Sequence, residues 1–276
     1  MRYLAVVAAA CVCLTLISCS SGPSAPQPGT PGFYWGAAQS SYRAGDYLKT
    51  NDTLNSLLRH ENEFTARGEP WSLVLSAGIT HGLMELADTY DKGSQANKTN
   101  FAILHREASA LRTLANTTAL SEAELFHSFR VQRKDAQIAL AFEFPPVNPP
   151  EPPALQRVSG GTPLPAGDLE ELQNAMVQRG VIFAISRVLG ADDPIKAQEV
   201  FKKGDVRVSR ERFLTGMAES LFDQAELYDR KHINDPRKAS IFCNEAAAAL
   251  QGVPQDKEVN DLLQRIQKTQ KTLPTT

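Results

Sequence analysis

Hydrophobic residues recur at intervals of three and four positions through nearly all of the chain after Pro31, which is the period of a helix with one buried face. The alternating apolar and polar runs that predict strands, joined by hairpin turns, do not occur. The period predicts helices at about residues 33–44, 46–60, 70–91, 97–115, 121–142, 167–189, 193–202, 209–230, 235–251 and 255–271. We therefore expect an all-α fold.

Polar residues at several of these helix starts agree with the apolar period. Ser121 and Glu124 have the spacing of a capping box, and the acidic pair of Glu122 and Glu124 suits a helix N-terminus, where negative charge complements the dipole. Asp193 and Asp235 each precede a proline, which helices accept at their first position. New helices are therefore expected to begin at these three points.

A proline-rich segment interrupts the helical pattern. The stretch FPPVNPPEPPALQRVSGGTPLP, residues 144–165, contains eight prolines, which forbid helix and favour a stiff polyproline conformation. We expect a linker at 144–166 between one helical unit at 33–143 and a second at 167–276. The alternative is that the prolines form a ligand for a partner domain.

The two predicted units share a sequence pattern. The stretch ADTYDK at 87–92 returns as AELYDR at 225–230, an offset of 138, and the same offset aligns Gly78 with Gly216. The preceding helices align at an offset of 147. The change from one offset to the other falls in the loops around 60–72 and 203–210, where insertions are tolerated. Two duplicated multi-helix units are the pattern of an α-solenoid, so 33–115 should superpose on 172–251. The alternative is the partial agreement that any two alanine-rich helices show.

The N-terminus has the pattern of a secretory signal peptide over residues 1–18. Arg2 supplies a positive charge, and Leu4–Ile17 is an apolar run too short to span a bilayer. Residues 19–32 contain mainly Ser, Gly, Pro, Thr, Ala and Gln, which predicts a flexible tether. The alternative is an ordinary secreted protein that is cleaved after Ser18.

The stretch LISC, which ends at Cys19, resembles the lipobox of bacterial lipoproteins. The resemblance implies cleavage before Cys19, a diacylglycerol thioether on its sulfur, and acylation of its new amino group, with palmitate as the expected chain. In that family an Asp after the lipidated cysteine favours retention in the inner membrane. Because Ser20 follows Cys19 here, the resemblance implies an anchor in the outer membrane, facing the periplasm.

Residues 34–58, YWGAAQSSYRAGDYLKTNDTLNSLL, resemble a tetratricopeptide repeat (TPR). Ala38, Tyr42 and the turn at 45–47 match the motif, whereas Thr50 replaces its usual alanine and the closing proline is absent. The resemblance implies a TPR-like α-solenoid that binds partners in a groove, with a C-terminal capping helix. A looser resemblance is to periplasmic TPR lipoproteins associated with TRAP-type transporters, whose helical repeats enclose a pore or groove for an apolar ligand.

Four residues are candidates for partner binding by this resemblance, because the first helix of a repeat lines the concave surface: Trp35, Gln39, Tyr42 and Arg43. A groove with aromatic anchors and an arginine suits a peptide. The alternative is that Trp35 and Tyr42 close the open end of the solenoid. The proline-rich linker is also long enough to cross the concave face and restrict access to it.

Composition and motifs favour no particular chemistry. Lys and Arg total 29 against 31 Asp and Glu, so no basic footprint for nucleic acid is expected. The usual hydrolase, zinc-protease, paired-cysteine and phosphate-loop motifs are absent. The five histidines are not spaced for a helical metal site, and the cluster of His60, Glu61 and Glu63 fits solvated charge best. Cys243 is the only cysteine after Cys19, so the mature chain cannot form an internal disulfide.

The sequence therefore predicts a membrane-anchored periplasmic lipoprotein that acts as a non-enzymatic protein-binding or scaffold module, with no cofactor or metal. Its expected partners are the membrane, through the lipid, and an envelope protein that enters the groove. The alternative is a carrier that binds a small apolar ligand for a transporter. A periplasmic hydrolase is a third alternative, and it would need His, Glu and Asp to converge in a cleft with shifted pKa values.

Overall fold

The structure, a computed structural model, describes residues 26–146, 152–230 and 232–273. Ten α-helices make up most of this part of the chain, so the all-α prediction is confirmed. The predicted signal peptide, Cys19 and the first part of the tether lie outside the described residues.

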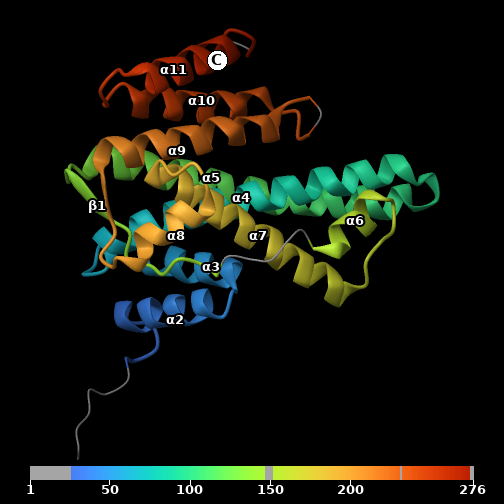
Figure 1. The fold of residues 1–276 in the computed structure, drawn as a ribbon, viewed down its shortest axis with the longest axis horizontal. Helices are drawn as coiled ribbons and strands as arrows, with labels where there is room; N and C mark the ends of the chain where they lie inside the picture. Colours follow the sequence, from blue (N-terminus) through green and yellow to red (C-terminus); the bar gives the residue numbers. More distant parts are fainter. Residues whose placement is uncertain (1–25, 147–151, 231, 274–276) are drawn as a thin grey trace, which may run out of the picture.

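The helices are stacked in a layered body, from α2 at one end to α11 at the other (Figure 1). Two 32-residue helices, α4 and α5, run side by side at the centre and project as a hairpin around the 3-10 turn at Lys98–Asn100. In chain order the helices are α2 (Pro31–Arg43), α3 (Tyr47–Leu57), α4 (Thr65–Ala96), α5 (Phe101–Gln132), α6 (Pro153–Ser159), α7 (Ala166–Leu189), α8 (Pro194–Lys202), α9 (Arg210–Gln224), α10 (Pro236–Leu250) and α11 (Lys257–Gln270). A 3-10 turn, η2 (Ala225–Tyr228), follows α9.

Glycines bring the backbones of α4 and α7 into direct contact. A Cβ built on Gly180 would lie 2.0 Å from the carbonyl oxygen of Gly78, and one built on Gly78 would lie 2.4 Å from the Cα of Val181. No side chain fits between the helices at this crossing. The first helix of the second predicted unit therefore packs tightly against the long central helix of the first.

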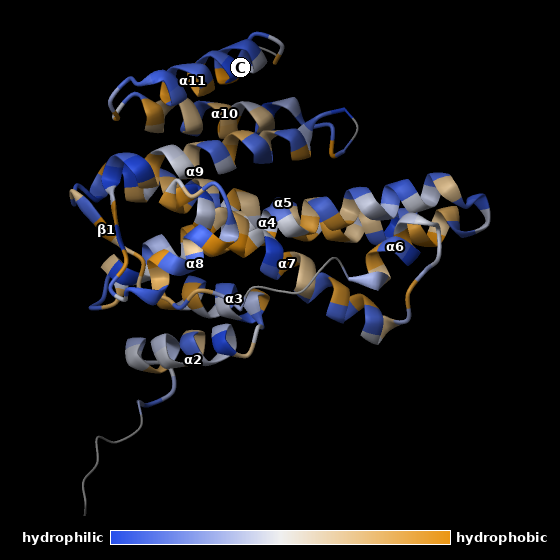
Figure 2. Ribbon diagram, viewed as in Figure 1, coloured by the Kyte–Doolittle hydropathy of each residue, from blue (hydrophilic) through white to orange (hydrophobic). Residues whose placement is uncertain are grey.

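The two predicted units share one hydrophobic core, which extends from Trp35 on α2 to Ile266 on α11. Hydrophobic residues lie along the facing sides of the central helices, while the outer side of α11 is hydrophilic (Figure 2). Val259, Leu262 and Ile266 form the buried stripe of α11. This single polar-faced helix covers the end of the stack.

One expected helix break was wrong, because α5 is continuous from Phe101 to Gln132. Ala115, Ala119 and Ala123 continue its buried face across the expected break. The hydroxyls of Thr117 and Thr118 donate to the carbonyls four residues earlier, so they bond within the helix instead of ending it. The predicted capping box at Ser121 and the acidic pair that follows it therefore lie inside a helix.

A short sheet corrects the expectation that the chain has no strands and that a helix runs to 142. Strands β1 (Gln137–Ala139) and β2 (Arg207–Ser209) pair antiparallel, with Ile138 opposite Val208. Both strands are only three residues long, too short for an alternating pattern to stand out in the sequence. They tie the segment after α5 to the loop between α8 and α9.

Two proline positions were also misread. Helix α6 forms within the proline-rich linker, where Pro153 occupies its first turn and needs no N–H partner. Helix α4 begins at Thr65, so Pro70 lies inside it instead of marking its start. The expected starts after Asp193 and Asp235 are confirmed, and each aspartate accepts a hydrogen bond from the backbone N–H three residues later.

The duplication stays a prediction. Helices α2 to α5 and α7 to α10 follow the same order, but α4 and α5 have 32 residues each, whereas α9 and α10 have 15. Gly78 and its counterpart Gly216 both lie at close crossings with α7, since a Cβ on Gly216 would be 2.8 Å from the Cα of Val188. Shared order and shared close contacts favour related units, while the unequal lengths weaken the match.

Candidate functional site

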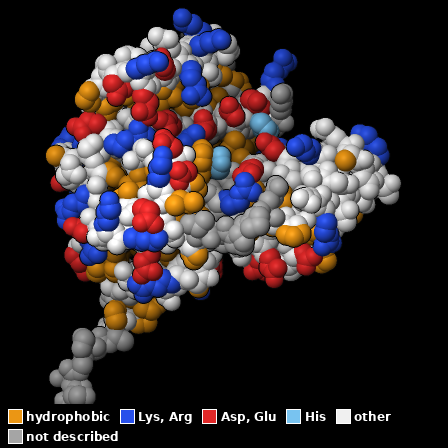
Figure 3. All heavy atoms as spheres, in the orientation of Figure 1, with side chains coloured by type: hydrophobic (Ala, Val, Ile, Leu, Met, Phe, Trp, Pro, Cys, Tyr) orange, Lys and Arg blue, Asp and Glu red, His pale blue; other side chains and the backbone are white. Residues whose placement is uncertain are grey.

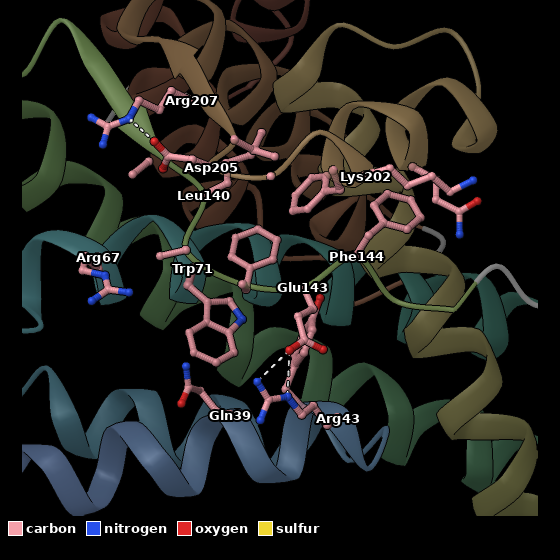
Figure 4. Close-up of a pocket in the computed structure, with 18 residues that line it drawn as sticks. Gln39, Arg43, Arg67, Trp71, Leu140, Glu143, Phe144, Lys202, Asp205 and Arg207 are labelled. Atoms are coloured by element: carbon pink, nitrogen blue, oxygen red, sulfur yellow. Dashed lines mark hydrogen bonds and ion pairs between the residues drawn. The ribbon is translucent and has the colours of Figure 1, made fainter.

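A cleft of about 690 Å³ opens between α2, the start of α4 and the region around α8. Ligand-binding pockets have similar volumes, roughly 300–1,000 Å³. Its wall includes residues 139–144, which run from β1 across the gap between these helices (Figure 4). The remaining lining residues are Gln39, Tyr42, Arg43, Arg67, Trp71, Gln198, Phe201, Lys202 and 204–207.

Aromatic rings form the floor of the cleft. Trp71 of α4 lies edge-on to Tyr42 of α2, with ring centroids 5.3 Å apart. It also stacks on Phe142, with ring centroids 6.0 Å apart. Phe142 in turn lies 5.7 Å from Phe201 on α8. Aromatic pairs at these separations attract one another beyond the area that they bury. The floor thus joins α2, α4 and α8, which are far apart in the sequence.

Charged side chains surround this floor. Arg43 pairs with Glu143 at 2.6 Å, and Arg207 pairs with Asp205 at 3.2 Å. Arg67 lies over the ring of Trp35, with its guanidinium carbon 5.0 Å from the ring centroid. The lining contains four basic residues and two acidic ones, so basic charge exceeds acidic charge at the cleft.

Two buried hydrogen-bond donors in the floor have no partner in the described part of the chain: the hydroxyl of Tyr42 and the indole N–H of Trp71. The two residues are only 5% and 2% exposed. Burial, and then the nearby Tyr47 and Glu143, raise the pKa of Tyr42 well above its usual value, so its phenol stays neutral and keeps its proton. Each unpaired buried donor costs about 1–3 kcal/mol, so ligand acceptors that reach them would be favoured.

The structure brings together three of the four predicted site residues. Gln39, Tyr42 and Arg43 line the cleft. Trp35 is buried behind it, stacked on Phe64 at 5.2 Å and edge-on to Trp71 at 5.4 Å, so it supports the floor. The alternative role of Trp35, which is to close the open end of the solenoid, stays a prediction.

Several cleft residues were missed by the sequence analysis. They come from four segments of the chain that no local motif links, and they are Arg67, Trp71, Glu143, Phe201 and Arg207. One signal was available, because the linker that starts near residue 144 is long enough to cross the binding face. Residues 142–144 do line the cleft, just before the prolines begin.

No group of three or more His, Cys, Asp or Glu residues in the described part of the chain is placed to hold a metal ion. Glu61, from the predicted cluster with His60 and Glu63, forms an ion pair with Arg133 at 3.0 Å. Burial raises the pKa of Cys243 to about 11, so this thiol stays protonated at neutral pH and is a poor nucleophile.

Two further cavities lie away from the cleft. One, of about 340 Å³, lies between α4, α7 and α9, where His81 stacks on Phe183 at 4.3 Å and Arg187 pairs with Asp223 at 2.5 Å. Burial lowers the pKa of His81, which favours a neutral ring. The other, of about 530 Å³, lies between η2 and the end of α11. Acidic and basic side chains are interspersed over the face shown in Figure 3, without a large patch of one sign.

Glu122 is an ionisable group buried in the contact between α5 and α9. It is 1% exposed, and one of its carboxyl oxygens accepts a hydrogen bond from Gln224 at 2.7 Å. Burial raises the pKa of Glu122 to about 8, against a smaller lowering by Gln224. The folded protein therefore holds this proton well above the usual carboxyl range near 4.5.

We expect Glu122 to make the protein less stable as pH rises from about 5 to about 8. The unfolded chain releases the proton near 4.5, whereas the folded chain keeps it up to about 8, so the contribution is complete below 4.5 and lost through this window. One pKa unit corresponds to about 1.4 kcal/mol, so the wild type should lose a few kcal/mol more unfolding free energy between pH 5 and pH 8.5 than Glu122→Gln loses. Urea unfolding of both proteins at the two pH values measures this difference.

Glu124→Gln, two residues away and exposed, is the matched control and should keep the wild-type pH profile. Equal profiles for Glu122→Gln and the wild type would contradict a protonated buried Glu122.

Comparison with protein-family models, with curated proteins and with solved structures finds no match. No helix in the described part of the chain is long and apolar enough to span a bilayer. The cleft's own geometry is therefore the basis for assigning a function.

Proposed function

We propose that this protein is a non-enzymatic binding protein that holds an extended segment of a partner polypeptide in the cleft. The observation that carries the proposal is the combination of a buried aromatic floor with an open, charged rim. Buried aromatic residues and arginines supply much of the binding energy at protein interfaces. A polypeptide segment offers apolar side chains to the floor and polar groups to the rim at the same time.

The exposed rim favours a polypeptide over a small apolar ligand. The side chains of Arg43 and Glu143 are 60% and 61% exposed, and Lys202 is similarly open. A carrier for an apolar molecule would be expected to enclose a dry cavity instead. The volume of about 690 Å³ nevertheless suits a small molecule, so a carrier that serves a transporter is the second candidate.

The proposal places the protein at the bacterial outer membrane, held by a lipid on Cys19 and facing the periplasm. In this proposal the helices form a TPR-like solenoid of two related units, and the tether lets the body reorient. Anchoring two partners to one surface raises their effective concentration, so modest affinity in the cleft is sufficient. An envelope protein is the expected partner, and nucleic acid is not.

Selection of displayed random peptides on the purified protein tests this function. We expect related sequences to be enriched on the wild type and to lose binding to Gln198→Trp, which places a larger side chain in the cleft. The matched control is Gln264→Trp, which lies on an exposed position of α11 and should bind like the wild type. The proposal fails if no sequence family is enriched, or if the enriched peptides bind Gln198→Trp as well as the wild type.

Native mass spectrometry of the gently purified protein tests the second candidate. A retained small apolar molecule, absent from Gln198→Trp, would favour the carrier.

A further inference from the structure

Residues 140–146, which we call the strap, cross the cleft as an extended segment. At one end the N–H of Leu140 donates to the carbonyl of Val206 at 2.9 Å, and at the other the amide of Gln178 donates to the carbonyl of Pro146 at 2.7 Å. Between these anchors, the backbone N–H groups of 141–144 have no hydrogen-bond acceptor in the described part of the chain. The middle of the strap is therefore held by its side chains.

Those side chains alternate across the strap as in a bound peptide. Phe142 and Phe144 both contact Phe201 of α8, with ring centroids 5.7 Å and 5.4 Å apart. Glu143 points the other way, toward Arg43 of α2 (Figure 4). Successive side chains of an extended segment face opposite sides, so one short segment fills both an aromatic and a basic part of the cleft.

The contact between Glu143 and Arg43 is easily exchanged. Both side chains are about three-fifths exposed, and exposed ion pairs contribute little to stability. Another carboxylate could therefore replace Glu143 on Arg43 at small cost. The unpaired indole nitrogen of Trp71 lies on the side of its ring that faces Glu143, so acceptor atoms brought to this point would also meet a buried donor.

The remaining charge in the cleft also favours an anionic group. Asp205 is engaged by Arg207, and Lys202 pairs with Glu199 at 2.7 Å. Arg67 has no carboxylate partner in the described part of the chain and lies over the ring of Trp35. Arg67 is thus available to a bound carboxylate, and Arg43 becomes available once Glu143 moves aside.

We propose that the partner segment carries a carboxylate side chain between aromatic residues, and that Phe142, Glu143 and Phe144 are the chain's own stand-in for it. This inference rests on the proposed function and names the chemistry of its ligand. Glu143 competes with the partner for Arg43 and so weakens its binding. Removing the Glu143 charge should therefore strengthen binding, which a merely structural role for the strap does not predict.

Peptide titration of the purified full chain tests this competition. The probe is the blocked peptide Ala-Phe-Glu-Phe-Pro-Pro, which copies residues 141–146, compared with versions that carry Gln or Lys in place of Glu. Both tryptophans of the chain, Trp35 and Trp71, lie in the aromatic cluster, so intrinsic fluorescence reports binding there. Calorimetry provides a second readout, independent of changes around the rings.

We expect the Glu peptide to bind about tenfold tighter than the Gln peptide, the size of one hydrogen bond to a charged group. Glu143→Gln should bind the Glu peptide several-fold tighter than the wild type does, and Arg43→Gln about tenfold more weakly. Arg106→Gln, which removes an exposed arginine outside the cleft lining, is the control and should leave the affinity unchanged. Circular dichroism of each variant confirms that the fold is retained.

Equal affinity for the Glu, Gln and Lys peptides, or no gain in Glu143→Gln, would overturn the inference. If all three peptides bind the wild type but not Gln198→Trp, the polypeptide-binding function still holds and only its proposed ligand chemistry fails. If none binds at millimolar concentration, the inference also fails, and the display selection decides the function separately.

Discussion

Replacing Gly180 with valine is expected to destabilise the protein by on the order of 4 kcal/mol or more, which places it among the most damaging single substitutions. The added Cβ would lie 2.0 Å from the carbonyl oxygen of Gly78 and 2.8 Å from the backbone nitrogen of Gly82. Backbone atoms cannot rotate away as side chains do, so α4 and α7 would have to separate. Because α4 packs against both α5 and α7 at the centre, this separation would disrupt packing on several sides.

Urea unfolding followed by circular dichroism measures the loss, and Gly167→Val is the matched control. Gly167 is on the same helix, but a Cβ there would meet no atom within 4 Å. The control should therefore stay within about 1 kcal/mol of the wild type. Similar stability for the two variants would contradict the close contact between α4 and α7.

Replacing Trp71 with alanine is expected to cost about 3–5 kcal/mol, the usual loss for a large buried aromatic. Trp71 is 2% exposed and contacts the rings of Trp35, Tyr42 and Phe142. Its removal would leave a cavity in the floor of the cleft. The midpoint and slope of urea unfolding measure the change in free energy.

Phe101→Ala is the control for Trp71→Ala. Phe101 is 44% exposed at the start of α5, so its removal should cost less than about 1 kcal/mol. Equal losses in the two variants would show that the aromatic cluster is not a packed centre. If Trp71→Ala does not fold, Trp71→Phe, which keeps one ring in the cluster, should fold with a smaller loss.

The helical class could be predicted from the sequence because burial follows the helical period, but some boundaries could not. At Ser121, a local capping pattern competed with the buried face of Ala115, Ala119 and Ala123, and the packing against neighbouring helices decided the outcome. The short strands β1 and β2 depend on pairing between segments about 70 residues apart, which no local pattern encodes. Helix α6 formed because proline is tolerated in a first turn.

The candidate site was predictable only on the side formed by α2. Tyr42 and Arg43 follow Gln39 by three and four residues on α2, so the helical period places all three on one face. The other side of the cleft comes from segments far apart in the sequence, with Arg67 on α4, Glu143 after β1 and Phe201 on α8. Their chemical types are common, so their proximity had to come from tertiary structure.

Amide hydrogen exchange with and without a peptide selected on the wild type tests the central claim that the cleft is the binding site. The strap amides at 141–144 make no hydrogen bonds in the described structure and should exchange rapidly in the free protein. The account predicts that the peptide slows exchange at the cleft-lining residues 39–43 and 198–207, while the strap, whose side chains it replaces, still exchanges rapidly. Protection confined to another surface, such as 222–230, 234–239 and 269–273 around the cavity near α11, would contradict it.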